Sequence, residues 1–160
     1  MRKKLGRSIN LVKQDAPPSP SGQLVFERQF PAGNEAKNEV LEELLDALQS
    51  SGAISGETEQ VRMRLCLDEG LVNAVMHGSR HDATKTVSVR AWVSAENWSI
   101  LIEDQGQGFR DEDLPDPEAP ENLLEESGRG VHLMRNMMDS VNYWRGGRSL
   151  LLSRKRNTSA

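Results

Sequence analysis

The sequence predicts an α/β protein built as a two-layer sandwich, with a mixed, mainly antiparallel sheet and helices on one face. Three observations lead to this class. Residues alternate between two sides near residue 24 and between residues 87 and 102, which is typical of half-buried strands. Other segments carry apolar residues every three or four positions, which is typical of amphipathic helices. The length of 160 residues is that of one ordinary domain.

The first strand and helix follow directly from these patterns. Leu24 to Phe30 alternates and is ended by Pro31, so we expect a strand there. Apolar residues at helical spacing predict a helix over 35–49, with Asn34 as its N-cap.

A second helix and a hairpin are expected next. The helix runs from Glu57 to His77 and stops at Gly78. Two alternating strands, 87–93 and 98–103, flank a turn at 94–97 and form a half-buried β-hairpin. The apolar stripe predicted for the second helix is Val61, Leu65, Val72 and Val75/Met76. The apolar side of the hairpin is expected to meet Leu44, Leu65, Val72 and Leu133.

The remaining chain contains one long loop and three short elements. Residues 105–127 carry glycines, prolines and eight acidic side chains between Asp111 and Glu126, which is typical of a functional loop or lid. A helix is expected from Gly130 to Met138, followed by strands at 140–144 and 149–153.

The start of the chain has a different composition. Residues 1–22 hold five basic residues, one acidic residue and three prolines, so we expect a disordered, basic tail ahead of a domain at 23–160. Such a tail is either an arm for an acidic partner or a solvated leader.

The overall composition excludes several classes of protein. The net charge of −4 disfavours a general nucleic-acid binder, and 4% aromatic residues disfavour a base-stacking platform. The single cysteine, Cys66, rules out an internal disulfide and a cysteine-rich metal site. No apolar run approaches the roughly 18 residues that span a bilayer. We therefore expect a cytoplasmic protein with no nucleic-acid or membrane partner.

Polar residues on the second helix form the first candidate site. Glu69, Asn73 and His77 are spaced four apart, so they project from one face on successive turns. Such a face is either solvated or lines a site.

Two glycine-containing motifs follow. Asp104, Gly106 and Gly108 come directly after a strand, where the carboxylate can accept from an amino group and the glycines let a ligand approach the backbone. A plain turn would also account for them. Gly128-Arg129-Gly130 opens a helix, an arrangement that suits an anion. Neither motif is a P-loop or a dinucleotide-binding fingerprint.

Together and in this order, the motifs resemble the N, G1 and G2 boxes of the ATP-binding fold shared by gyrase, histidine kinases and MutL. The runs 67–78, 102–109 and 128–134 are most similar to those of bacterial anti-sigma factor serine kinases. The resemblance covers about residues 24–155.

The resemblance implies a role for each matching residue. Asp104 would accept from the adenine amino group, and Asn73 would bind Mg²⁺. Glu69 would be the general base toward a serine or threonine hydroxyl. The backbone of Gly106, Gly108, Gly128, Arg129 and Gly130 would surround the nucleotide, and His77 would be structural or would support the residues that contact it.

Two features depart from the family. Gly146-Gly147-Arg148-Ser149 stands where the family has a Gly-Thr pair, so the hydroxyl that helps to hold the nucleotide is displaced or replaced. The acidic lid would repel phosphate unless it faces away or binds a basic partner.

The function implied is an ATP- and Mg²⁺-dependent protein serine/threonine kinase that captures a sigma factor and phosphorylates an anti-anti-sigma antagonist, as a homodimer. One alternative is an ATP-binding switch without kinase activity. A detached histidine-kinase catalytic domain is disfavoured, because residues 1–23 contain no dimerisation helix pair with a phospho-accepting histidine.

Overall fold

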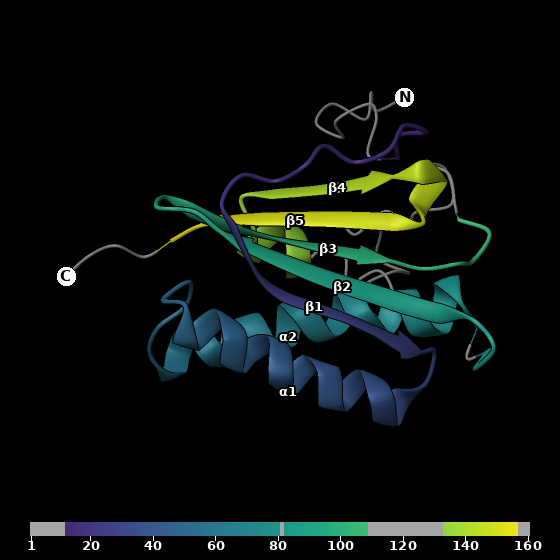
Figure 1. The fold of residues 1–160 in the computed structure, drawn as a ribbon, viewed down its shortest axis with the longest axis horizontal. Helices are drawn as coiled ribbons and strands as arrows, with labels where there is room; N and C mark the ends of the chain where they lie inside the picture. The colour runs from purple at the N-terminus through teal and green to yellow at the C-terminus, as the bar shows by residue number, and fades with distance from the viewer. Residues whose placement is uncertain (1–11, 81, 109–132, 157–160) are drawn as a thin grey trace, which may run out of the picture.

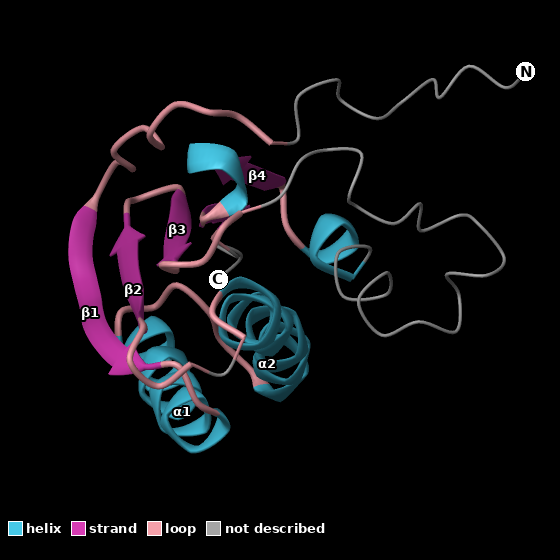
Figure 2. Cartoon of the chain, turned by 90° about the vertical axis from the view of Figure 1, so that its right-hand side faces the viewer, coloured by secondary structure: helices cyan, strands magenta, loops and turns pink. Residues whose placement is uncertain are grey.

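A computed structural model describes residues 12–80, 82–108 and 133–156. Within these residues the chain forms a five-stranded sheet with helices packed on one of its faces (Figure 1, Figure 2). The elements in chain order are β1 (Gln23–Pro31), α1 (Asn34–Ser50), α2 (Glu57–Val72), the π-helical turn η1 (Asn73–Gly78), β2 (Thr86–Val93), β3 (Asn97–Glu103), a short helix at 133–137, β4 (Ser140–Trp144), the 3₁₀ turn η4 (Arg145–Gly147) and β5 (Ser149–Lys155).

The sheet has the strand order β1-β2-β3-β5-β4, and every pair of neighbouring strands is antiparallel. A parallel contribution comes from an isolated bridge between Val12 and Tyr143. The expected two-layer sandwich with a mainly antiparallel sheet is therefore confirmed. The last strand, β5, lies between β3 and β4, so β4, which comes first after residues 109–132, is at the edge of the sheet.

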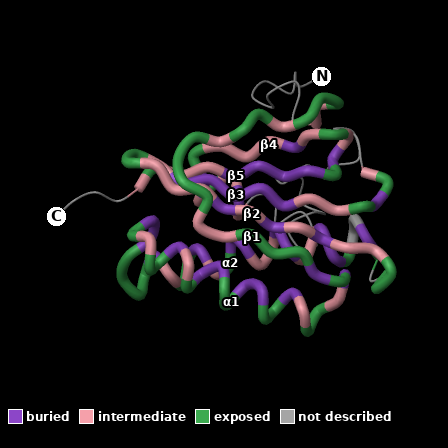
Figure 3. Tube along the Cα trace, in the orientation of Figure 1, coloured by how far each residue is buried: buried purple, intermediate pink, exposed green. Residues whose placement is uncertain are grey.

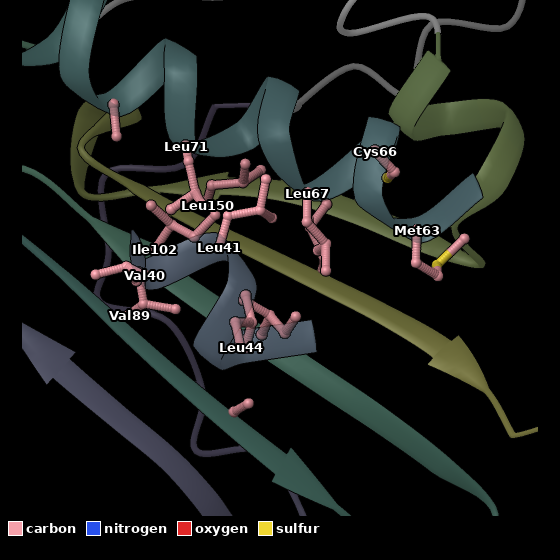
Figure 4. Packing of buried hydrophobic residues seen from close by; sticks show 14 of the residues in the cluster. Val40, Leu41, Leu44, Met63, Cys66, Leu67, Leu71, Val89, Ile102 and Leu150 are labelled. Atoms are coloured by element: carbon pink, nitrogen blue, oxygen red, sulfur yellow. The ribbon is translucent and has the colours of Figure 1, made fainter. Parts of the chain in front are cut away.

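The core fills the space between the sheet and the two long helices. Figure 4 shows leucines and valines of α1 and α2 packed over Val89, Ile102 and Leu150 of the sheet. Leu44 is fully buried, as expected. The buried positions alternate along β2 and recur at helical spacing along α1 (Figure 3).

The buried face of α2 differs from the predicted stripe. Leu65 is 52% exposed and Val61 is also exposed, whereas Val72 and Leu133 are half-buried. The inner face of α2 is therefore rotated relative to the predicted stripe. Several of its inward positions are small or polar, so apolar periodicity does not indicate them. The inward positions of α2 are Glu59, Met63, Cys66, Leu67, Gly70 and Leu71.

Part of the expected disordered tail is ordered. Lys13 donates its backbone N–H to the Tyr143 carbonyl at 2.9 Å, and the backbone carbonyl of Asp15 accepts from the backbone N–H of Arg145 at 2.9 Å. Lys13 also places its ammonium 4.6 Å from the centre of the Trp144 ring. We call residues 12–22 the N-terminal segment; it runs beside β4 and then crosses to β1 at the other edge (Figure 1). Residues 1–11 lie outside the described part of the chain.

One helix boundary also differs from the prediction. Gly33, in extended conformation, occupies the N-cap of α1, and Asn34 is the first helical residue. The helix therefore begins without a capping side chain, and Glu35 in its first turn compensates through the helix dipole. Across the described ranges, every helix is too short or too polar to cross a lipid bilayer.

Candidate functional site

Near its C-terminal end, α2 packs closely against the sheet, next to the polar residues Glu69 and Asn73. Gly70 lies one residue after Glu69 and three before Asn73, and a Cβ placed there would lie 3.0 Å from Ile102 Cδ1 and 3.3 Å from Leu150 Cδ2. The missing side chain thus lets α2 approach β3 and β5 closely. Glu69 and Asn73 are half-buried beside this contact.

The regular helix changes to a π-helix at Asn73, over Asn73–Gly78. Single π-helical turns occur frequently at functional sites, because the wider turn moves side chains off the α-helical register. Burial raises the pKa of Tyr143 on β4 well above its usual range, and the nearby side chain of Asn73 acts to lower it. His77 belongs to the same turn, and its side chain lies outside the described residues.

Asp104 follows β3 and is held by its neighbours. Its backbone N–H donates to the carbonyl of Arg148 at 2.9 Å, and its Oδ1 accepts from the backbone N–H of Gly106 at 2.7 Å. Burial raises the pKa of Asp104 to about 6, while the Gly106 N–H and the nearby positive charge of Arg148 act in the opposite direction. A half-buried carboxylate with one oxygen fixed in this way can offer Oδ2 to a donor on a ligand.

Gly108 requires its lack of a side chain. Its φ is +77°, and an added Cβ would lie 2.0 Å from the carbonyl oxygen of Gly146. Gly106 is buried nearby. The loop after β3 is therefore pressed against η4, as the predicted close-approach motif requires.

These two parts of the site lie at the same end of the sheet. α2 and β3 run in the same direction, so that their C-terminal ends are adjacent (Figure 1). Gly70 contacts Ile102, two residues before Asp104, and Asn73 lies near Tyr143, whose strand partner on β5 is Leu150. Of the predicted site residues, the structure thus brings Glu69, Asn73, Asp104, Gly106 and Gly108 to one region.

The other predicted site residues lie outside the described part of the chain. Gly128, Arg129 and Gly130 belong to residues 109–132, as does the lid except for its first residues 105–108. Their assigned roles therefore stay predictions.

At residues 146–149, where the sequence departs from the family, the hydroxyl of Ser149 is used within the sheet. The Ser149 hydroxyl donates to Glu103 Oε2 at 2.7 Å. Glu103 also accepts from Arg90 and Arg145, each at 3.1 Å. Burial raises the pKa of Glu103, but these hydrogen bonds outweigh it and leave the pKa below its usual value. The hydroxyl is therefore committed to an ion-pair cluster on the sheet face away from the helices.

The described residues fit an adenine nucleotide with a divalent cation. The half-buried carboxylate of Asp104 as an acceptor for an amino group, a loop in which Gly108 cannot carry a side chain, and an amide oxygen at Asn73 are groups that such a ligand needs. Mg²⁺ is usually held by one or two protein oxygens together with phosphate oxygens and water, so Asn73 would supply one of its ligands.

Three structural features escaped sequence reasoning. The close approach at Gly70 gives no signal in the apolar periodicity of α2, although an isolated glycine in a helix often marks close packing. The salt bridge between Lys37 of α1 and Asp68 of α2, at 2.7 Å, directs Asp68 away from the site. The proximity of Tyr143 to Asn73 brings together residues 70 positions apart and leaves no local signal in the sequence.

A family model described as histidine kinase-like ATPase domain matches residues 30–154. Three curated relatives are similar to this chain. Serine-protein kinase RsbW of Bacillus licheniformis is 35% identical over 85 residues, 49% of this chain and 53% of the relative. Anti-sigma F factor of Clostridium perfringens (strain SM101 / Type A) is 31% identical over 107 residues, 62% and 75% of the two chains. Anti-sigma F factor of Anoxybacillus flavithermus (strain DSM 21510 / WK1) is 30% identical over 90 residues, 54% and 60% of the two.

The aligned part spans about half the length of the Bacillus licheniformis relative and three quarters of the Clostridium perfringens relative. The family match covers the sheet from the end of β1 to β5 and includes every site residue predicted above. The chain therefore belongs to the histidine kinase-like ATPase domain family, as the resemblance to anti-sigma factor serine kinases implied.

Proposed function

We propose that this chain is an ATP-dependent protein serine/threonine kinase that acts as an anti-sigma factor. One observation carries the proposal: Glu69 of α2 and Asn73 of η1 lie at the same end of the sheet as the loop that begins at Asp104. The names of the relatives, serine-protein kinase and anti-sigma F factor, support the same function.

In the proposed mechanism the adenine amino group donates to Asp104. Asn73 would bind Mg²⁺ through its side-chain oxygen, and the cation would neutralise phosphate charge. Glu69 takes the proton of a serine or threonine hydroxyl on the protein substrate. The hydroxyl oxygen then forms a bond to the γ-phosphorus, while the bond from that phosphorus to the β–γ bridging oxygen breaks and ADP leaves.

The proposed partners are proteins. The chain would capture a sigma factor and phosphorylate an anti-anti-sigma antagonist that otherwise displaces it, as a cytoplasmic homodimer. Gly128, Arg129 and Gly130 would contact the phosphates in this proposal. Sigma-factor capture and phosphate transfer are separable, since only the second requires a base.

Glu69→Gln tests the proposal most directly. Glutamine keeps the size of the side chain but cannot accept the hydroxyl proton, so transfer of labelled phosphate from ATP to an antagonist should fall by about 10²–10⁴-fold. Nucleotide binding and sigma-factor capture should stay near the wild-type level. Glu43→Gln makes the same change on the exposed face of α1, beside Arg28, and should transfer phosphate normally.

The product identifies the class of kinase. Phosphoserine is stable in acid and labile in alkali, whereas phosphohistidine shows the reverse. Transfer at the wild-type rate by Glu69→Gln would refute the base assignment. Wild-type protein that binds ATP but phosphorylates no serine-bearing partner would favour the switch without kinase activity.

A further inference from the structure

The 3₁₀ turn η4 has a strained backbone. Its three residues all have positive φ angles, +54° at Arg145, +68° at Gly146 and +96° at Gly147. Glycine adopts this left-handed region freely, whereas the Cβ of an arginine makes it unfavourable. The Arg145 side chain donates to Glu103 Oε2 at 3.1 Å, and its carbonyl accepts from Arg148 Nε at 3.0 Å. A non-glycine residue keeps such a conformation only where its surroundings hold it, so the remaining contacts of the turn matter.

The N-terminal segment holds η4 through its backbone. The N–H of Arg145 donates to the carbonyl of Asp15 at 2.9 Å. The N–H of Gly146 donates to the carbonyl of Lys13, also at 2.9 Å. The side chain of Gln14 lies beside the same turn, since a Cβ added at Gly146 would lie 3.4 Å from Gln14 Oε1. The first two amide groups of η4 are thus bonded to a segment that is far away in the sequence.

The turn η4 also contacts residues 104–108, which we call the Asp104 loop. A Cβ added at Gly108 would lie 2.0 Å from the carbonyl oxygen of Gly146, so the two backbones are in direct contact. The backbone N–H of Asp104 donates to the carbonyl of Arg148, directly after η4, at 2.9 Å. The turn therefore connects the N-terminal segment to the Asp104 loop, at the end of the sheet where β3 and β4 end (Figure 1).

The attachment of the N-terminal segment at η4 buries little apolar surface. Residues 14–16 are exposed, and the ammonium group of Lys13 lies 4.6 Å from the centre of the Trp144 ring. Pairing with β4 is an isolated bridge at Val12 and not a ladder of the kind that joins the five strands. Loss of these contacts leaves the sheet paired, so the segment can detach without unfolding of the domain.

We propose that the N-terminal segment is a positioning element of the nucleotide site, because its backbone holds η4 in the left-handed conformation that supports the Asp104 loop. The inference rests on the proposed function, since it requires the Asp104 loop to bind nucleotide. When the segment detaches, the N–H groups of Arg145 and Gly146 lose their acceptors, and Arg145 relaxes toward ordinary φ values. Nucleotide affinity then decreases with the fraction of molecules in which η4 keeps its shape. Bound nucleotide in turn stabilises the attached segment.

Hydrogen exchange on the wild-type full chain tests this coupling. The amide protons of Arg145 and Gly146 exchange when the segment detaches, whereas those shared by β1 and β2 exchange when the sheet opens. Saturating ADP should slow exchange at Arg145 and Gly146 about fivefold to thirtyfold, which corresponds to the cost of a left-handed conformation in a non-glycine residue. Unchanged exchange at these two positions, with slower exchange in β1 and β2, would overturn the inference although nucleotide is bound.

Lys13→Pro tests the same coupling in the opposite direction. Proline lacks the N–H that donates to the Tyr143 carbonyl, so the segment detaches more readily and exchange at Arg145 and Gly146 should become faster. Lys13→Ala is the reference, since it also removes the ammonium group but keeps the N–H. Calorimetry should show ADP bound about threefold more weakly, or weaker still, by Lys13→Pro than by Lys13→Ala. Equal affinities of the two variants would contradict the inference.

Ser19→Pro is the matched control for a proline in this segment. Ser19 is exposed, and its backbone N–H has no hydrogen-bond partner among the described residues. The variant should bind ADP within about twofold of the wild type. A loss as large as that of Lys13→Pro would mean that any proline in the segment has the same effect, which would refute the role of the backbone contact with β4.

The outcomes separate this inference from the proposed function. The exchange measurement needs no variant, so it decides the question even where Lys13→Pro does not fold. If ADP slows exchange neither at η4 nor in β1 and β2, no nucleotide binds, and the proposed function fails together with the inference. If Lys13→Pro speeds exchange in β1 and β2 as much as at Arg145 and Gly146, the segment stabilises the whole domain, and its positioning role is refuted.

Discussion

Asp104 illustrates a conflict between stability and binding in a single side chain. Its carboxylate is half-buried and accepts from the Gly106 N–H, yet burial raises its pKa to about 6. The pKa of this acid in the folded protein lies above its ordinary value of 3.8, so ionisation costs stability, and the cost grows as pH rises from about 4 to about 6. Above that window the nucleotide-free protein bears the full cost.

Asp104→Asn should therefore stabilise the nucleotide-free protein while weakening nucleotide binding. The amide still accepts from Gly106 and removes the buried charge, which favours folding by about 1–3 kcal/mol at pH 8. Its nitrogen presents a donor where an acceptor is needed, so affinity for ADP should fall roughly tenfold or more. Thermal unfolding and calorimetry measure the two effects. A variant that binds ADP like the wild type would count against the adenine role of Asp104.

The same residue predicts a pH dependence of binding. Protonation of Asp104 below pH 6 places an O–H toward the adenine amino group, so nucleotide affinity should decrease as pH falls from 7 to 5. The phosphates of the ligand also titrate in this range. Calorimetry on Asp104→Asn over the same pH range supplies the reference, because the ligand and the other side chains titrate there as in the wild type, whereas position 104 does not. Parallel profiles for the two proteins would show that Asp104 does not contribute.

At the scale of elements, the site depends on how closely α2 approaches the sheet. Gly70 is the contact point, with Ile102 and Leu150 opposite it. The direction of Glu69 and Asn73 follows from this packing. Lys37 of α1, which is 8% exposed, pairs with Asp68 on the other side of α2 and opposes rotation of the helix.

Gly70→Val should push α2 away from the sheet. The larger side chain overlaps two buried branched residues, and overpacking of this kind costs about 1–3 kcal/mol in the free energy of unfolding. Nucleotide affinity should decrease as well, because Asn73 moves with the helix. Leu65→Val places the same side chain on the exposed face of α2 and should cost only a few tenths of a kcal/mol. Equal destabilisation of the two variants in urea unfolding would contradict the close approach at Gly70.

The phase of α2 also shows where prediction from sequence ends at this scale. All five strands lie where the sequence predicted them, and alternation indicated the first three, because a strand has a simple period of two. The expected half-buried hairpin is wrong for β3, whose residues 98–102 are all buried, so that both faces of the strand are covered. Apolar periodicity misplaced the inner face of α2, since Glu59, Cys66 and Gly70 face inward without being large and apolar. α2 has apolar residues on two sides, so its sequence alone does not show which side is buried. The neighbouring strands decide this, because Gly70 allows them to approach one side closely.

At the scale of the whole molecule, the order of the motifs along the chain predicted the family better than any motif alone. Each motif is short and admits an ordinary interpretation, but the fold brings the C-terminal ends of α2 and β3, which Asn73 and Asp104 directly follow, to one end of the sheet. Contacts between distant segments could not be predicted. The pairing of Lys13 with Tyr143 joins a region of tail-like composition to the last hairpin, and composition alone contains no information about such a partner.

Cys66 provides a probe of the whole fold. The thiol is fully buried, and burial raises its pKa to about 12, with a smaller contribution from the charge of Glu69 in the same sense. An aromatic disulfide reagent reacts with thiolate, so at pH 8 the folded protein should react at least about a hundredfold more slowly than the protein in guanidinium. A nucleotide that binds the folded state should slow the reaction further. Equal rates in folded and denatured protein would contradict the packing of α2 against the sheet.

The position of β5 between β3 and β4 has a consequence for the folding of the chain during its synthesis on the ribosome. The last strand in the chain order occupies an interior place in the sheet, and β1 pairs with β2 only after both helices have been made. Before β5 emerges from the exit tunnel, the nascent chain exposes the unpaired edge of β3 and an unpartnered β4. Exposed edges of this kind recruit other strands, so the interval between synthesis of β3 and β5 is when this chain most needs protection by a chaperone.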